Sequence, residues 1–222
     1  MVEGTGDKEY IEKYLAIYKK KEYYVDFAGG CPSIKPEFKK LINQFKKDEL
    51  QNKKFILLYD FDPEGYNSFY TCTDNGIFSD NNFMVKDDKL NSEFLILKNI
   101  EAKKDLIAMM HKPIEKENFN KDFIAFYEYS EEKNLVVSKN NKQAVDVEIE
   151  DLIVAYNVDK YKEFLKEHKQ YSFDIKQFFS IDRGNTCKES VKSFFEDKHT
   201  DKDFNFAGFD ELFKRIEANF KN

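Results

Sequence analysis

The first half of the chain contains an unbroken apolar run, Phe55–Tyr59, between polar segments. Such a run predicts a strand buried on both faces, like the strands inside a parallel sheet. The run stops at Asp60, and Asp62 follows where it can cap a helix that begins at Pro63. The two aspartates therefore come after the carboxyl end of a predicted strand, which is where open α/β sheets bind ligands.

The same segment also fits a simple turn. Asp62-Pro63-Glu64-Gly65 has aspartate, proline and glycine at positions i, i+1 and i+3 of a type I turn. On this interpretation the aspartates form only local structure. The segment alone supports the turn and the functional site equally, so the choice depends on the rest of the chain.

Periodic apolar positions predict helices on both sides of another strand. Apolar side chains recur at helical spacing over residues 10–18 and 38–45, and Tyr23–Phe27 between them is typical of a strand. A further helix is expected through residues 66–70. The first 75 residues therefore alternate strand and helix, which predicts a parallel sheet with crossover helices.

Two features bear on where the domains begin and end. Only Met1 and Val2 precede Glu3, so either the first strand is very short or the natural protein is longer at this end, and we expect the longer protein. After residue 76 the pattern is less regular. Strands are expected over 83–85, 94–97, 124–129 and 135–137, the last two as a pair, and helices over 106–110, most of 144–170, and from 186 and 209 onward. We expect a core over residues 1–100 and a mostly helical extension over residues 101–222, packed on the core or inserted into it.

Composition narrows the function classes. The 222 residues are 41% hydrophobic and carry a net charge of −6, which argues against nucleic-acid binding by bulk electrostatics. Metal ions at an acidic site would reverse the local field. Three cysteines without CxxC spacing predict a reducing compartment, and no apolar run has the length of a membrane span. We therefore expect a cytoplasmic protein with no membrane partner and no zinc site.

Two short motifs, Val2-Glu3-Gly4 with Asp7 and Asp60-Phe61-Asp62 with Gly65, resemble the pattern of the Toprim domain. This catalytic module is shared by topoisomerases, bacterial primases, the OLD-family (overcoming lysogenisation defect) nucleases and a ribosomal-RNA maturase. Gly29-Gly30 is similar to the family's glycine-bearing loop. The resemblance implies an α/β, Rossmann-like fold with a central parallel sheet flanked by helices, in which residues 1–100 are the Toprim-like core and the C-terminal extension is mostly helical.

The resemblance also implies roles for four acidic residues. Glu3 would be a general acid/base and a metal ligand, and Asp60 and Asp62 would be catalytic and the principal ligands of Mg²⁺ or Mn²⁺. Asp7 stands where the nuclease branches carry a further acid, but a carboxylate is also favoured at a helix start. Glu3 gains nothing obvious from folding, and Glu64 fits a solvated turn. Lys188 is a candidate catalytic lysine, although a solvent-exposed lysine is the commoner case.

These features predict a divalent-metal-dependent nuclease that hydrolyses DNA or RNA. The chain lacks a recognisable topoisomerase tyrosine and the zinc-binding region of primases. It also lacks the GxxxxGK[ST] motif, so an ATPase would be a separate domain or subunit. The oligomeric state is left open. One alternative is a catalytically inactive Toprim-like module that binds nucleic acid or protein, and another is an α/β domain whose aspartates only form turns.

Overall fold

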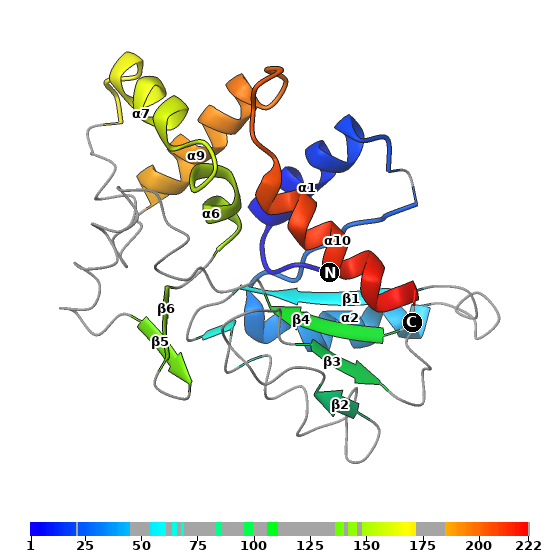
Figure 1. The fold of residues 1–222 in the computed structure, drawn as a ribbon. Coiled ribbons are helices and arrows are strands. Elements are labelled where there is room, and N and C mark those ends of the chain that lie inside the picture. The colour runs from blue at the N-terminus through cyan, green and yellow to red at the C-terminus, as the bar shows by residue number, and fades with distance from the viewer. Residues whose placement is uncertain are drawn as a thin grey trace. The chain divides into compact units, whose positions relative to one another are not determined.

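The computed structural model describes residues 1–20, 22–44, 54–60, 64–65, 68, 83–85, 96–99, 106–110, 136–139, 142–145, 148–171 and 185–221. The chain divides into two compact units (Figure 1). The first unit contains Met1–Pro113 and Glu211–Asn222, and the second contains Ile114–Asp210. The first unit thus combines the first half of the chain with its last residues.

A four-stranded sheet lies in the first unit, in the order β1-β4-β3-β2. Strand β1 (Phe55–Tyr59) pairs in parallel with β4 (Leu106–Met110), in a register that places Phe55 opposite Leu106. Strands β3 (Ile96–Asn99) and β2 (Phe83–Val85) continue the sheet in antiparallel pairs. The described sheet is therefore mixed, and its parallel pair contains the apolar strand that precedes Asp60.

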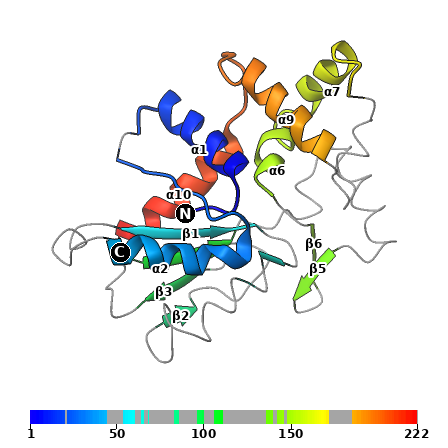
Figure 2. The same cartoon turned by 180° about the vertical axis from the view of Figure 1, so that it is seen from behind.

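The first residues of the chain extend the sheet beyond β1. The Met1 nitrogen donates to the Ile56 carbonyl at 2.7 Å, and the Leu58 N–H donates to the Met1 carbonyl at 2.9 Å. On its other side, Val2 forms an isolated parallel bridge with Phe27. Met1 and Val2 therefore lie between β1 and the segment that ends at Phe27, so that even two residues before Glu3 form sheet pairs (Figures 1 and 2).

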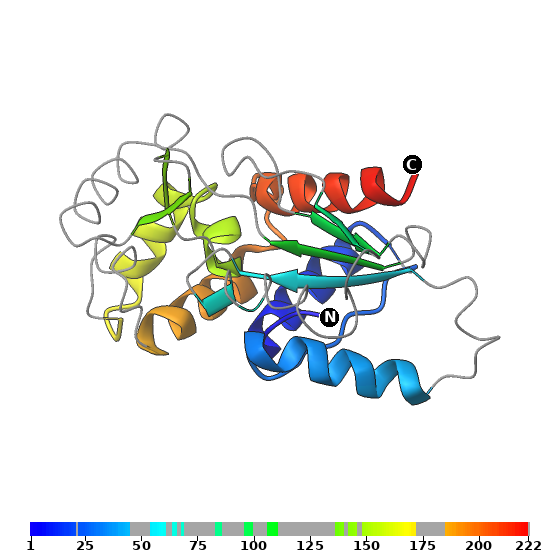
Figure 3. The same cartoon turned by 90° about the horizontal axis from the view of Figure 1, so that it is seen from below.

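Three helices pack in the first unit. Helix α1 (Thr5–Ile17) buries one face, and its Tyr14 ring stacks on Phe213 of α10 (Ala207–Lys221) with centroids 5.0 Å apart. Helix α2 (Ile34–Gln44), preceded by the 3₁₀ turn η1 (Cys31–Ser33), contacts β1 through the Phe38 and Phe55 rings. Helices α2 and α10 lie on opposite sides of the strands (Figure 3). A cavity of about 950 Å³ lies near the start of β1, lined mainly by apolar side chains.

The second unit is built around aromatic side chains. It contains the hairpin β5 (Val136–Lys139) and β6 (Lys142–Val145), then α6 (Ile149–Val154), α7 (Val158–Glu167), α9 (Asn185–Lys198) and the first residues of α10. Its core includes Tyr161, Phe164, Phe194, Phe195 and Phe209, each at most 1% exposed. Helix α10 approaches α6 closely at Gly208, where a Cβ would lie 2.8 Å from the Leu152 carbonyl oxygen.

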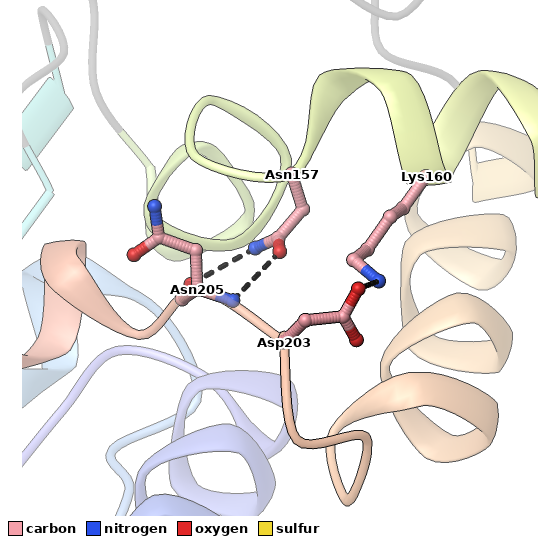
Figure 4. A network of polar contacts seen from close by, with 4 residues as sticks. All are labelled: Asn157, Lys160, Asp203 and Asn205. Atoms are coloured by element: carbon pink, nitrogen blue, oxygen red, sulfur yellow. Dashed lines mark hydrogen bonds and ion pairs between the residues drawn. The ribbon is translucent and has the colours of Figure 1, made fainter.

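A buried amide joins two segments of the second unit. The Asn157 side chain donates to the Asn205 carbonyl and accepts from the Asn205 N–H, both at 2.9 Å (Figure 4). Lys160, one turn further along α7, forms an ion pair with Asp203 in the same loop. The loop before α10 is thus fixed at one buried and one exposed point.

The structure corrects two predicted elements. Tyr23–Phe27 is not a strand, because the short segment before Glu3 offers it only one isolated bridge, between Val2 and Phe27. Residues 106–110 form strand β4, because Leu-Ile-Ala-Met-Met fits between β1 and β3, where both edges of the strand find hydrogen-bond partners. The expected strand near 135–137 is β5, and its partner is β6; residues 124–129 lie outside the described residues. Within the described part of the chain, no helix is long and apolar enough to cross a bilayer.

Candidate acidic site at the end of strand β1

The side chain of Glu3 reaches the end of β1. Its Oε1 accepts a hydrogen bond from the backbone N–H of Asp60, the residue directly after the strand, at 2.9 Å and across 57 positions of sequence. Both residues are half-buried. The structure therefore brings together two of the four predicted site residues, and it gives Glu3 a role in folding that was not evident from the sequence.

The main chain of Glu3 is fixed from the other side. Its carbonyl oxygen accepts hydrogen bonds from the N–H groups of Gly29 and Gly30, at 2.9 and 2.8 Å. These glycines have φ values of +83° and +114°, where L side chains are strained. Both glycines are thus needed by the loop that holds Glu3, and Glu3 is positioned by this loop and by β1 together.

Asp7 caps helix α1. Its Oδ2 accepts a hydrogen bond from the Gly4 N–H at 2.8 Å, and Asp7 is the third residue of the helix, where a carboxylate also interacts well with the helix dipole. The expectation of a helix-start carboxylate is confirmed, and a metal-binding role for Asp7 stays a prediction. Gly4 itself has φ −120°, and an added Cβ would come no closer than 3.7 Å to Asp7.

A cysteine that the sequence did not single out lies beside this site. The buried Cys31 thiol accepts a hydrogen bond from the Ser68 hydroxyl at 3.4 Å. Burial raises the pKa of the Cys31 thiol to about 12, the Ser68 hydrogen bond opposes this rise, and the negative charges of Glu3 and Glu64 add to it. The thiol therefore stays protonated and is a poor nucleophile. A lone cysteine in no recognised spacing gave no sequence signal for this position.

The donor atoms at this site suit a hard divalent cation. Carboxylate oxygens are the preferred protein ligands of Mg²⁺, and the Glu3 carboxylate lies at the backbone of a second acidic residue, Asp60. Asp62, the third predicted ligand, lies outside the described residues. Among the residues that are described, no three histidine, cysteine or acidic side chains lie close enough to hold a metal ion. The ligand set thus stays a prediction that needs Asp62.

The structure also describes Glu64 and Lys188, which the sequence predicted to be exposed to solvent. Glu64 is exposed, as expected, but it is helical and does not belong to a simple turn. Lys188, in the second unit, has a side chain that is 46% exposed and lies 3.3 Å from Glu148. This ion pair is consistent with a surface lysine.

Comparison of the chain with protein-family models, with curated proteins and with solved structures finds no match.

Proposed function

We propose that this chain is a divalent-metal-dependent nuclease of the Toprim class, with a Rossmann-like core, that hydrolyses phosphodiester bonds in DNA or RNA. Asp60 and Asp62 would bind Mg²⁺ or Mn²⁺ together with Glu3, and Asp7 would contribute from the start of α1. The observation that supports this proposal best is the hydrogen bond between the Glu3 carboxylate and the Asp60 N–H, because it brings both predicted motifs to one point at the end of β1.

Each residue has a distinct task in this proposal. A divalent ion held by these carboxylates would lower the pKa of the attacking water and stabilise negative charge on the phosphate. The Glu3 carboxylate, held by the Asp60 N–H while Gly29 and Gly30 hold the Glu3 main chain, would accept the water proton as the new P–O bond forms. It would then give this proton to the leaving oxygen as the old P–O bond breaks. Without a cation, the acidic residues and the net charge of −6 would repel the phosphate. The proposal therefore requires a bound metal ion.

The proposal includes the cellular location of the protein and an ATPase partner. We place it in the cytoplasm, in line with cysteines that lack disulfide-type spacing. Any ATPase that works with the nuclease would be supplied by another domain or subunit, since the chain has no phosphate-binding loop motif.

The direct test is cleavage of labelled DNA and RNA with Mg²⁺ or Mn²⁺. Wild-type protein should cleave at least one substrate, and EDTA should stop the reaction. Asp60→Ala and Asp62→Ala should each abolish it, whereas Asp201→Ala, which removes an exposed acid in the second unit, should not. Cleavage that persists in EDTA, or that survives both site substitutions, would contradict the proposal.

One observation favours the inactive-module alternative. Glu3 Oε1 and Asp7 Oδ2 already accept backbone hydrogen bonds, so both acids have structural reasons to be present without any metal. A protein that binds nucleic acid in EDTA and never cleaves it with either cation would support this alternative.

A further inference from the structure

Two aromatic side chains and one lysine form an exposed patch near Glu3. Tyr24 is 78% exposed and Phe27 is 40% exposed, whereas Val25 between them is 8% exposed. Tyr24 is the most exposed large hydrophobic or aromatic residue in the described part of the chain. We call Lys8, Tyr24 and Phe27 the aromatic patch.

The lysine lies close to both rings. The Lys8 Nζ is 6.0 Å from the centroid of the Tyr24 ring and 5.8 Å from that of Phe27, which are cation–π distances. Nζ is also 3.9 Å from a carboxylate oxygen of Glu12 and of Asp26, beyond hydrogen-bond distance. The ammonium group is thus held between the rings, and two neighbouring acids balance its charge.

The chain connects this patch directly to the acidic site. Phe27 bridges Val2, the residue before Glu3. Gly29 and Gly30, which follow closely in sequence, hold the Glu3 carbonyl. Lys8 follows Asp7 in the first turns of α1. The two rings therefore belong to the segment whose backbone pairs with the residues next to Glu3.

We propose that the aromatic patch binds a single-stranded segment of the nucleic-acid substrate, with bases stacked on Tyr24 and Phe27 and a phosphate near Lys8. This inference rests on the proposed nuclease function. Base stacking on aromatic rings tolerates any sequence, since every base has a π face. It also suits a chain with a net charge of −6, because stacking does not need a large positive surface.

The affinity of the aromatic patch for a single strand should depend only weakly on salt concentration. With a single lysine facing the phosphates, the slope of log affinity against log salt should be about −0.7 or shallower for a single strand. Raising the salt concentration fourfold should therefore weaken binding by no more than about threefold. A protein that binds through many phosphate contacts would lose far more.

The test uses the absence of tryptophan from the chain. Tyr24→Trp places one indole in the patch, and Tyr18→Trp places one at another exposed position, 46% exposed, at the end of α1. Both variants are titrated in EDTA with mixed-sequence single-stranded DNA and RNA oligonucleotides. The Tyr24→Trp emission should be quenched on binding, and the Tyr18→Trp emission should change little.

Alanine variants then measure the contribution of each ring. Tyr24→Ala and Phe27→Ala should each weaken oligonucleotide binding about tenfold, and Tyr18→Ala should leave it unchanged. Thermal melts of every variant show that the fold is retained. Failure of single strands to bind, an unquenched Tyr24→Trp, alanine variants that bind like wild type, or a steep salt slope would overturn the inference.

The outcomes separate this inference from the proposed function. If the Tyr24 and Phe27 variants cleave and bind like wild type, the patch is excluded and the nuclease proposal stands. If the patch binds single strands as described but neither cation supports cleavage, the nuclease proposal fails and the binding surface stands.

Discussion

The Glu3 carboxylate accepts a hydrogen bond from the backbone N–H of Asp60 at 2.9 Å, which joins the first residues of the chain to the end of strand β1. This bond has a structural part, because it satisfies a partly buried N–H, and a proposed chemical part, because it fixes a carboxylate beside a second acid. The two parts can be separated by substitution.

Glu3→Gln should keep the fold and remove the activity. Its amide oxygen can still accept the Asp60 hydrogen bond, but the side chain no longer carries a charge or acts as a base. Glu3→Ala leaves the Asp60 N–H without this acceptor and should lower the free energy of unfolding by about 1–3 kcal/mol. Urea unfolding of both variants, read together with cleavage assays, checks this. Equal stability loss in the two variants would show that the hydrogen bond is not the structural link.

A side chain at Gly29 or Gly30, in the loop that holds Glu3, should destabilise the protein. At φ +83° and +114°, Gly29→Ala and Gly30→Ala place a Cβ in a conformation that costs about 1–2 kcal/mol. Gly4→Ala is the matched control, because Gly4 has φ −120° and room for a methyl group. Chemical denaturation should show the loss at Gly29 and Gly30 and little change at Gly4. A Gly4 variant as destabilised as the other two would contradict this account of the loop.

The Cys31 thiol should make stability fall at alkaline pH. Its pKa rises from the ordinary value of 9.0 to about 12 in the folded protein, mainly because the thiol is buried. Below about pH 9 both states keep the proton and stability does not depend on this group. Above pH 9 the unfolded thiol ionises first, so stability drops by up to about 1.4 kcal/mol per pH unit until the folded pKa is reached.

Unfolding curves between pH 8 and pH 10.5 test this for wild type and Cys31→Ala. The variant should be less stable at pH 8 because it leaves a small void, but its stability should fall less with pH. Tyr23, whose pKa burial also raises, to about 12, contributes equally to both proteins and cancels in the comparison. Parallel pH profiles for the two proteins would show that the thiol ionises normally.

In the second unit, the buried amide should matter more than the ion pair beside it. Asn157 is 4% exposed and makes two hydrogen bonds to the Asn205 backbone, so Asn157→Ala removes two partly buried hydrogen bonds and should cost about 1–3 kcal/mol (Figure 4). Asp203→Ala removes only an exposed ion pair with Lys160 and should change stability little. Thermal melts of the two variants measure the contrast, and a larger loss for Asp203→Ala would reverse it.

Local patterns predicted several elements correctly, for definite physical reasons. The apolar run Phe55–Tyr59 is strand β1, and its last three residues are buried as the run implied. The periodic apolar positions of residues 10–18 correspond to α1, whose buried side includes Tyr10, Ile11 and Tyr14. Both patterns reflect the burial of apolar side chains, which any compact fold requires whatever its topology.

Other features depend on contacts distant in sequence and could not be predicted. Leu106–Met110 is apolar throughout, so its pattern fits a buried helix or a buried strand, and only pairing with β1 and β3 decides for the strand. The Glu3–Asp60 hydrogen bond joins side chain to backbone across 57 positions. The position of Cys31 beside Glu3 follows from the turn at Gly29 and Gly30, for which cysteine spacing carries no signal.

The central claim is that Glu3 and Asp60 share a divalent cation, and metal-dependent stability tests it most directly. With Mn²⁺ or Mg²⁺ at about a hundred times its dissociation constant, wild-type protein should gain about 2.7 kcal/mol in the free energy of unfolding. Asp60→Asn should be slightly more stable than wild type without metal, because it relieves repulsion, and both Asp60→Asn and Glu3→Gln should lose the metal-induced gain. Asp201→Asn, at an exposed position in the second unit, should keep it. A wild-type protein that neither cation stabilises, or site variants that gain as much as wild type, would contradict the claim.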